Sequence, residues 1–134
     1  MAERPDRGLL DTSVVIDLEQ LSATALPRQI AVSAITMAEL AAGPAAASDD
    51  GERARRQDRL QRAEATFDPL AVDNEVARAY GRIYAAVRAH GRSPRRRIAD
   101  LLIAATALAN ALPLVTRNPS DFAGLDDLIE ILEV

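Results

Sequence analysis

Four carboxylates and one amide lie where apolar segments of this chain end or begin. Asp11 closes the run GLLD, Glu39 lies early in the helix-like TMAELAAG, and Asp100 precedes the apolar LLIAATALA. The strand-like LPLVT is followed by TRNPSDF, which adds Asn118 and Asp121. Mg²⁺ and Mn²⁺ prefer oxygen ligands of this kind, whereas Zn²⁺ normally takes Cys or His. Because the chain has no Cys and one His, the pattern indicates a site for a hard cation.

The composition excludes several other chemistries. All 16 basic residues are Arg, and the absence of Lys excludes a Walker-type phosphate loop and a Schiff-base mechanism. With 134 residues, 49% of them hydrophobic, we expect residues 1–134 to form a single domain with a real core, preceded by a polar tail over residues 1–7. The lack of Cys, of a signal-peptide-like start and of a membrane-spanning run predicts a cytoplasmic protein.

The elements that would position these residues alternate between two patterns. Short apolar runs predict strands at residues 8–11, 30–35, 66–72, 112–116 and 129–134. Helical spacing of apolar or charged residues predicts helices at residues 53–65, 73–90 and 96–111. The small, polar stretch 43–52 predicts a flexible loop. This alternation predicts an α/β fold, a three-layer α/β/α sandwich around a central parallel sheet of about five strands, whose carboxyl ends hold the ligand.

Asp11 and Glu39 also have purely structural interpretations. Thr12 or Ser13 could cap a helix, which would leave Asp11 as a turn residue. Thr36 and Glu39 have the spacing of a capping box, in which the glutamate would turn back toward the start of its own helix. The functional alternative is that Asp11 projects from a strand end as a metal ligand, with Ser13 hydrogen-bonded to it.

The later residues have structural interpretations as well. Asp100 lies where the helix macrodipole favours a negative charge, and Asn118 before Pro119 is typical of a short helix start. His90 is expected at the surface, at a helix end. The charged stretch 53–62 is expected to be a solvated face, with contact to RNA or to a partner as the alternative. Such interpretations explain the acids singly, but they do not explain why the elements should bring the acids together.

Three segments in order resemble the PIN domain and, within that superfamily, the VapC toxins of VapBC toxin–antitoxin pairs: LLDTSVVIDLE, VSAITMAELAAG and RRRIADLLIAATALANALPLVTRNPSDFAGL. The resemblance runs from Leu9 to about the C-terminus. It implies a metal-dependent endoribonuclease that hydrolyses phosphodiester bonds in RNA, with tRNA or rRNA loops as expected substrates. It also implies a VapB-like antitoxin as partner, a homodimer, and a heterotetramer or larger complex with the antitoxin.

Carried over by position, the resemblance implies that Asp11, Glu39 and Asp100 bind Mg²⁺, with Mn²⁺ as a possible substitute, and are catalytic. The fourth acidic position of the family falls on Asn118, and Asp121 follows three residues later. A second ion would therefore use Asn118 or Asp121, and we count Asp121 among the expected catalytic residues.

The surroundings of the expected site complete the hypothesis. Ser13 and Thr116 are expected to support the metal ligands by hydrogen bonds. The net charge of −4 argues against broad non-specific binding to nucleic acid, so RNA contact is expected from a local cluster of arginines: Arg92, Arg95, Arg96 and Arg97. The competing interpretation is a non-catalytic α/β module that binds a partner protein and uses its acids as helix caps. Uptake of Mn²⁺ distinguishes the two.

Overall fold

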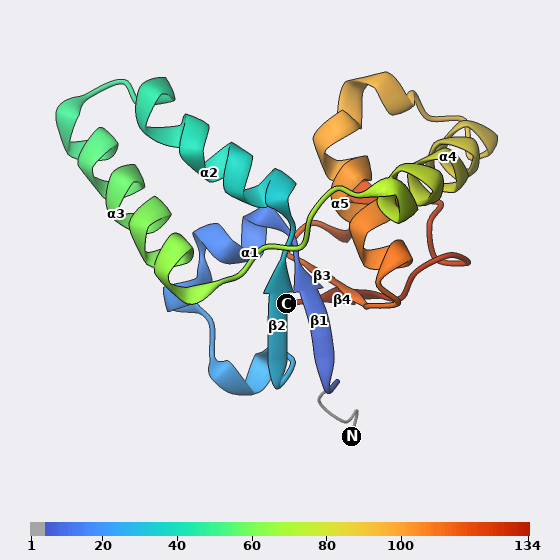
Figure 1. Cartoon of the computed structure of the whole chain (residues 1–134), viewed down its shortest axis with the longest axis horizontal. Coiled ribbons are helices and arrows are strands. Elements are labelled where there is room, and N and C mark those ends of the chain that lie inside the picture. The colour runs from blue at the N-terminus through green and yellow to red at the C-terminus, as the bar shows by residue number, and fades with distance from the viewer. Residues whose placement is uncertain (1–4) are drawn as a thin grey trace.

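The computed structural model describes residues 5–134 and contains one parallel sheet. Its four strands lie in the order β2-β1-β3-β4 (Figure 1). They are β1 (Arg7–Leu10), β2 (Gln29–Val32), β3 (Leu114–Thr116) and β4 (Ile131–Glu133). The prediction of an α/β fold with a central parallel sheet is confirmed, and four of the five predicted strands are present with shifted ends.

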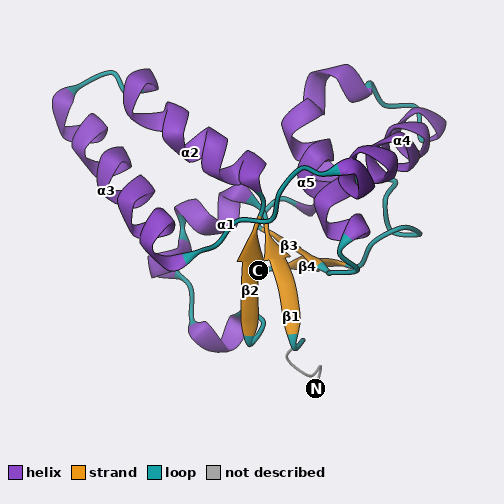
Figure 2. Cartoon of the chain, in the orientation of Figure 1, coloured by secondary structure: helices purple, strands orange, loops and turns teal. Residues whose placement is uncertain are grey.

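Two pairs of helices flank the sheet (Figures 1 and 2). One pair, α2 and α3, follows the short helix α1, and the other pair consists of α4 and α5. Their bounds are α1 (Thr12–Ile16), α2 (Ala34–Ala46), α3 (Asp50–Thr66), α4 (Asn74–Ala89) and α5 (Ile98–Ala109). No helix in residues 5–134 is both long enough and apolar enough to cross a membrane.

Alternation along the strands divides the core between the two faces of the sheet. Leu9 and Leu114 are fully buried against α4 and α5, whereas their neighbours Leu10 and Val115 are fully buried in the cluster that α1, α2 and α3 complete. Successive strand residues point to opposite faces, so each strand contributes to both clusters. Because helices cover both faces of the sheet, the strand sequences are continuous apolar runs and do not alternate between apolar and polar residues.

The fifth predicted strand, at residues 66–72, is wrong. Residues 67–73 form a loop between α3 and α4 (Figure 2), which touches the sheet at one point. There the Leu70 amide donates to the Val32 carbonyl at 2.9 Å, and the Leu70 carbonyl accepts from the Ala34 amide at 2.9 Å. The preceding residue, a proline, has no amide hydrogen, so the pairing cannot extend in that direction.

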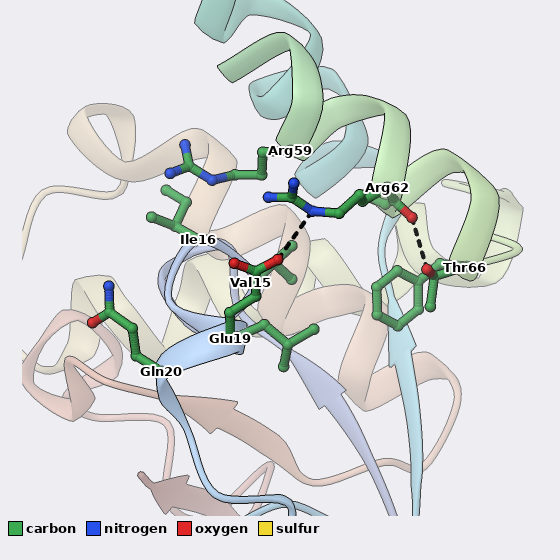
Figure 3. Close-up of a pocket in the computed structure, with 10 residues that line it drawn as sticks. Val15, Ile16, Glu19, Gln20, Arg59, Arg62 and Thr66 are labelled. Atoms are coloured by element: carbon green, nitrogen blue, oxygen red, sulfur yellow. Dashed lines mark hydrogen bonds and ion pairs between the residues drawn. The ribbon is translucent and has the colours of Figure 1, made fainter. Parts of the chain in front are cut away.

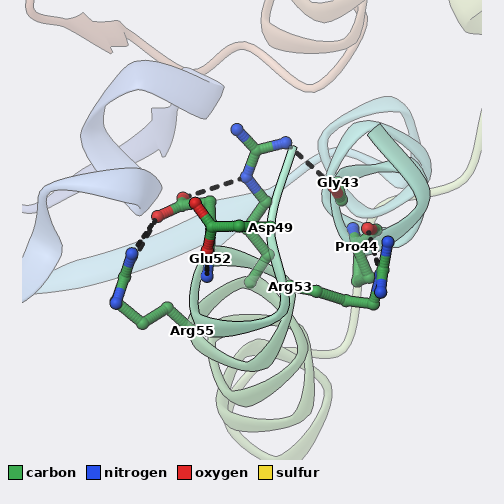
Figure 4. A network of polar contacts seen from close by, with 7 residues as sticks. Gly43, Pro44, Asp49, Glu52, Arg53 and Arg55 are labelled. Atoms are coloured by element: carbon green, nitrogen blue, oxygen red, sulfur yellow. Dashed lines mark hydrogen bonds and ion pairs between the residues drawn. The ribbon is translucent and has the colours of Figure 1, made fainter. Parts of the chain in front are cut away.

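The predicted loop at residues 43–52 is mostly helical, because α2 and α3 are separated by three residues only. Side chains of α3 bind backbone carbonyls near the end of α2. The Arg56 Nη1 atom donates to the Gly43 carbonyl at 2.9 Å, and the Arg53 Nε atom donates to the Pro44 carbonyl at 3.3 Å (Figure 4). These contacts hold the two helices together at their connection.

The polar tail predicted over residues 1–7 belongs in part to the sheet. Arg7 begins β1, and the Asp6 carbonyl accepts from the Gln29 amide at 2.8 Å. The Asp6 carboxylate also pairs with Arg28 at 3.0 Å. Residues 1–4 of this prediction lie outside the described residues.

Candidate active site

Asp11 follows β1 directly and is held by three hydrogen bonds. Its Oδ1 atom accepts from the Thr12 amide at 2.8 Å, while Oδ2 accepts from the hydroxyls of Ser13 at 2.8 Å and Thr116 at 2.9 Å. The side chain is 4% exposed. Asp11 is itself the cap of α1, so the interpretation of Thr12 or Ser13 as the cap is wrong. A buried carboxylate with three donors has a fixed orientation at the carboxyl end of the central strand.

The two hydroxyls beside Asp11 are also tied to the end of β3. The Ser13 hydroxyl accepts from the Arg117 amide at 3.3 Å, and the Thr116 hydroxyl accepts from the Asn118 amide at 3.0 Å. The structure therefore places Ser13 and Thr116 between Asp11 and the backbone of residues 117–118. This network joins the carboxyl ends of two neighbouring strands.

Glu39 projects from α2 toward the start of α1. Its Oε1 atom accepts from the Thr12 hydroxyl at 2.6 Å, and that hydroxyl also lies 3.0 Å from the buried hydroxyl of Thr36. The capping-box interpretation is wrong, because Ser33 caps α2 through a hydrogen bond from the Ile35 amide at 3.0 Å. Glu39 is thus free of its own helix end and exposed, and it faces the segment that follows Asp11.

Asp100 lies half-buried in the first turn of α5, among like charges. Burial, together with the negative charges of Asp11, Asp121 and Glu39, raises the pKa of its carboxyl from the ordinary 3.8 to about 6. The Arg97 guanidinium acts in the opposite direction. The shift identifies a region where four carboxylates influence one another and where one cation compensates them only in part.

Asp121 and Asn118 differ in how they relate to this region. Asp121 lies in a short turn, where the Arg97 Nη1 atom is 3.0 Å from its Oδ1 atom and 3.3 Å from its carbonyl. Asn118 precedes the turn with an exposed side chain that makes no capping hydrogen bond. Of the two, it is the charge of Asp121 that raises the pKa of Asp100.

The carboxylates suit a hard cation by their chemistry, although they are not gathered around one point. Within residues 5–134, no three acidic or imidazole side chains converge closely enough to hold an ion as they stand. Glu39 is hydrogen-bonded to Thr12, and Asp121 is paired with Arg97, so both would exchange these partners for an ion. The donors are all oxygen atoms, and the charges of Asp11, Asp121 and Glu39 contribute to the raised pKa of Asp100, so a cation would relieve their repulsion. The residues therefore fit Mg²⁺ or Mn²⁺.

The metal-free protein is expected to gain stability from Asp100→Asn at pH 7.5, and to lose this advantage at pH 4. The pKa of Asp100 is about 6 in the folded protein and near 3.8 in the unfolded chain, so the folded state binds this proton more tightly. The free energy of unfolding consequently falls as pH rises from about 4 to about 6. Asn cannot ionise, so the free energy of unfolding of the Asp100→Asn protein does not fall for this reason as the pH rises. Melting temperatures of both proteins in EDTA at the two pH values measure the effect, and a constant difference would contradict it.

The four arginines expected to bind RNA are not equivalent. Arg92 donates at 2.6 Å to a backbone carbonyl of the turn that holds Asp121, and Arg97 pairs with Asp121 itself. Both arginines therefore fasten this turn to the start of α5. Arg95 and Arg96 are exposed and have no ion-pair partner within the described part of the chain. The cluster thus combines two structural arginines with two free ones.

Two contacts of the site were missed from the sequence. The Thr12 hydroxyl holds Glu39, and a pocket of about 420 Å³ beside these two residues is lined from α3 by Arg56 and Arg59. The alternation of Arg with acidic and small residues in α3 predicts a solvated face, and nothing in that pattern shows which side meets α1. The charged stretch of α3 is therefore part of the surroundings of Glu39.

Comparisons with known proteins agree with this fold and show its family. Residues 8–128 match the model of the PIN domain. Ribonuclease VapC5 of Mycobacterium tuberculosis is 40% identical over 139 residues, which cover 100% of both chains. Ribonuclease VapC4 of the same organism is 35% identical over 133 residues, which cover 96% of this chain and 97% of that protein.

Solved structures give the same result. The crystal structure of VapBC-5, a member of the VapBC family of toxin–antitoxin systems from Mycobacterium tuberculosis, contains a chain with a TM-score of 0.85 and 39% identity, covering 97% of this chain and 100% of that one. A chain of FitAcB from Neisseria gonorrhoeae has a TM-score of 0.70 and 28% identity, with coverages of 93% and 96%.

The parallel sheet with acids at its carboxyl edge defines a PIN-domain protein of the generally metal-dependent ribonuclease class. Within it, the chain belongs to the VapC family of ribonuclease toxins of VapBC toxin–antitoxin systems.

Proposed function

We propose that this chain is a Mg²⁺-dependent endoribonuclease that acts in the cytoplasm as the toxin of a type II toxin–antitoxin pair. The observation that carries the proposal is that Asp100 lies half-buried beside the charges of Asp11, Asp121 and Glu39, and its burial and these charges together raise its pKa to about 6. Acids used only as helix caps would have no reason to face one another from four separate elements. Their repulsion costs stability unless a cation binds there.

The side chains have distinct roles in this proposal. Asp11 is the fixed ligand, because its three hydrogen bonds hold its orientation before any ion arrives. Asp100 and Glu39 complete the set from two helices on either side. When bound, Mg²⁺ supplies activation of water and charge neutralisation at the scissile phosphate. Asp121 is our choice for a second ion, because an amide oxygen at Asn118 brings no negative charge.

The substrate we favour is an unpaired loop, such as those of tRNA or rRNA. A protein with a net charge of −4 lacks the broad basic surface that non-specific duplex binding uses. Unpaired loops can turn their bases away and present the phosphate to a narrow acidic site. Arg95 and Arg96, which have free guanidinium groups, are candidates to hold the backbone of such a loop.

The partner we propose is a VapB-like antitoxin that binds a homodimer of this chain in a heterotetramer or a larger complex. One of the similar structures, with 39% identity, is described as a member of the VapBC family of toxin–antitoxin systems. A pocket of about 310 Å³ between α1 and α3 offers an apolar floor for such a partner (Figure 3). Val15, Leu18 and Phe67 contribute to this floor.

Removal of divalent metal is expected to stop the reaction completely. The purified chain should cleave an RNA with unpaired loops in Mg²⁺, leave it intact in EDTA, and recover when Mn²⁺ is added in excess of the chelator. Gel analysis of end-labelled RNA measures this, and an Asp100→Asn preparation made in parallel controls for contaminating nucleases. Failure to cleave, together with no heat of Mn²⁺ binding in calorimetry, would favour the non-catalytic binding module.

A further inference from the structure

Three arginines of α3 lie on the side of this helix that faces α1. Arg56, Arg59 and Arg62 are spaced by three residues, so they share one side of the helix, with a rise of about 4.5 Å from each to the next. Arg56 and Arg59 line the pocket of about 420 Å³ that also contains Thr12 and Glu39. Arg59 and Arg62 line the adjoining pocket of about 310 Å³ (Figure 3). Arg59 is therefore common to both pockets.

The three guanidinium groups differ in what they contact. Arg56 donates to Glu52 at 3.0 Å and to a backbone carbonyl of α2, so it joins two helices. Arg62 pairs with Glu19 at 3.1 Å. Arg59 makes no hydrogen bond or ion pair within residues 5–134, although it is half-buried. Burial of a charge without a partner costs free energy, which a bound anion would recover.

Figure 3 shows where the free guanidinium group lies. The Arg59 side chain extends over Ile16, and its guanidinium points away from the pair that Arg62 makes with Glu19. Ile16 lines the same two pockets and is 44% exposed. Next to Glu39, the surface thus carries the unpaired guanidinium of Arg59 above the exposed side chain of Ile16.

We infer that Arg59 binds a backbone phosphate of the substrate RNA, next to the phosphate that is cleaved. This inference rests on the proposed function, because it places the cleaved phosphate at Asp11, Glu39 and Asp100. The Arg59 pocket opens beside Glu39 and its partner Thr12, so a strand that leaves the cleavage site toward α3 meets this guanidinium. A planar guanidinium donates two parallel hydrogen bonds to phosphate oxygens, which a loose surface cation does not.

The acids in this pocket do not oppose such a contact. Glu52 is engaged by Arg55 and Arg56, and these hydrogen bonds lower the pKa of its carboxyl. Glu39 would be neutralised by the ion it binds in the active protein. The remaining charge of the pocket is then that of Arg59. We favour an RNA phosphate over an acidic side chain of a protein partner as the ligand of Arg59. The reason is that the pocket of Arg59 adjoins the proposed cleavage site.

The test uses Arg59→Gln in the cleavage-deficient Asp100→Asn protein and measures RNA binding by fluorescence anisotropy in Mg²⁺ over a range of salt concentrations. Loss of one charged phosphate contact should weaken binding about tenfold and lower the slope of log K against log salt by about one. Arg59→Lys keeps the charge and should restore the slope, with only part of the affinity. Arg88→Gln, an exposed arginine of α4 with no ion pair in the described chain, is the matched control and should change neither quantity.

The outcomes separate this inference from the proposed function. If the Asp100→Asn protein binds no RNA and the wild type cleaves none, the proposed function fails. If RNA binds but Arg59→Gln matches Arg88→Gln in affinity and salt slope, the phosphate site alone is refuted. Unchanged RNA binding with weakened antitoxin binding would also refute it, and would assign Arg59 to the protein partner. Circular dichroism of each variant checks that the fold persists.

Discussion

Asp11→Asn, Glu39→Gln and Asp100→Asn are each expected to abolish RNA cleavage in a protein that remains folded. Each change removes one charged metal ligand while it preserves the volume of the side chain. Loss of one such ligand should lower the single-turnover rate roughly a hundredfold or more. Cleavage rates at saturating Mg²⁺, with circular dichroism to confirm folding, measure the effect. Three folded variants with the rate of the wild type would show that the site is assigned wrongly.

The fold should tolerate the most buried of these changes. In Asp11→Asn the amide oxygen can keep the hydrogen bond from the Thr12 amide, and the new NH₂ group can donate to the hydroxyls of Ser13 and Thr116, which are able to accept.

The ligand of a second ion can be tested by comparing Asp121→Ala with Asn118→Ala, which serves as its control. In calorimetry, Mn²⁺ binding should weaken more in Asp121→Ala, and the reverse order would reject Asp121 as the ligand of a second ion.

Inhibition by an antitoxin encoded beside this chain is the second large effect that we expect. Co-expression with the product of the gene immediately upstream should restore the growth of cells that this chain arrests. The metal-free site carries several negative charges, and a guanidinium can bridge two carboxylates. Apolar anchors in the pocket between α1 and α3 would add affinity that salt does not remove.

The proposed inhibitor and the metal use the same oxygens, so they should compete. Rising Mg²⁺ at constant ionic strength is expected to weaken inhibition, whereas the same ionic strength made up with a monovalent salt should not. The inhibition constant measured in a cleavage assay gives the result. If no product of a neighbouring gene binds this chain or protects cells from it, a stand-alone nuclease becomes the better account.

The acidic residues were easier to single out from the sequence than the side chains that surround them. Asp11 and Asp100 can be singled out because each adjoins a continuous apolar segment. A parallel sheet also has the carboxyl ends of its strands at one edge, where ligands bind. The pairing of Arg97 with Asp121 joins residues 24 positions apart in two turns, and no local pattern specifies it. The same limit applies to Arg59, whose neighbours depend on how α3 packs against α1.

The errors in the elements have local physical causes. Residues 66–72 contain aliphatic and aromatic side chains that suit a strand, but the sheet accepts only one bridge, at Leu70. Gly43 and Pro44 are typical of loops, yet arginines from α3 bind the carbonyls of both residues and keep them helical. Ser33, not Thr36, caps α2, because the helix begins three residues earlier than a cap at Thr36 requires. In the first two cases a contact with another element overrode the local preference.

The hydrogen bond from Thr116 to Asp11 spans 105 positions of the chain. The neighbour of β1 on that side, β3, lies far from it along the chain. A nascent chain that has not reached β3 has neither the hydroxyl that fixes Asp11 nor the turn that carries Asp121. On the proposed site assignment, we therefore expect a chain that lacks β3 to cleave no RNA, even though it contains Asp11, Glu39 and Asp100.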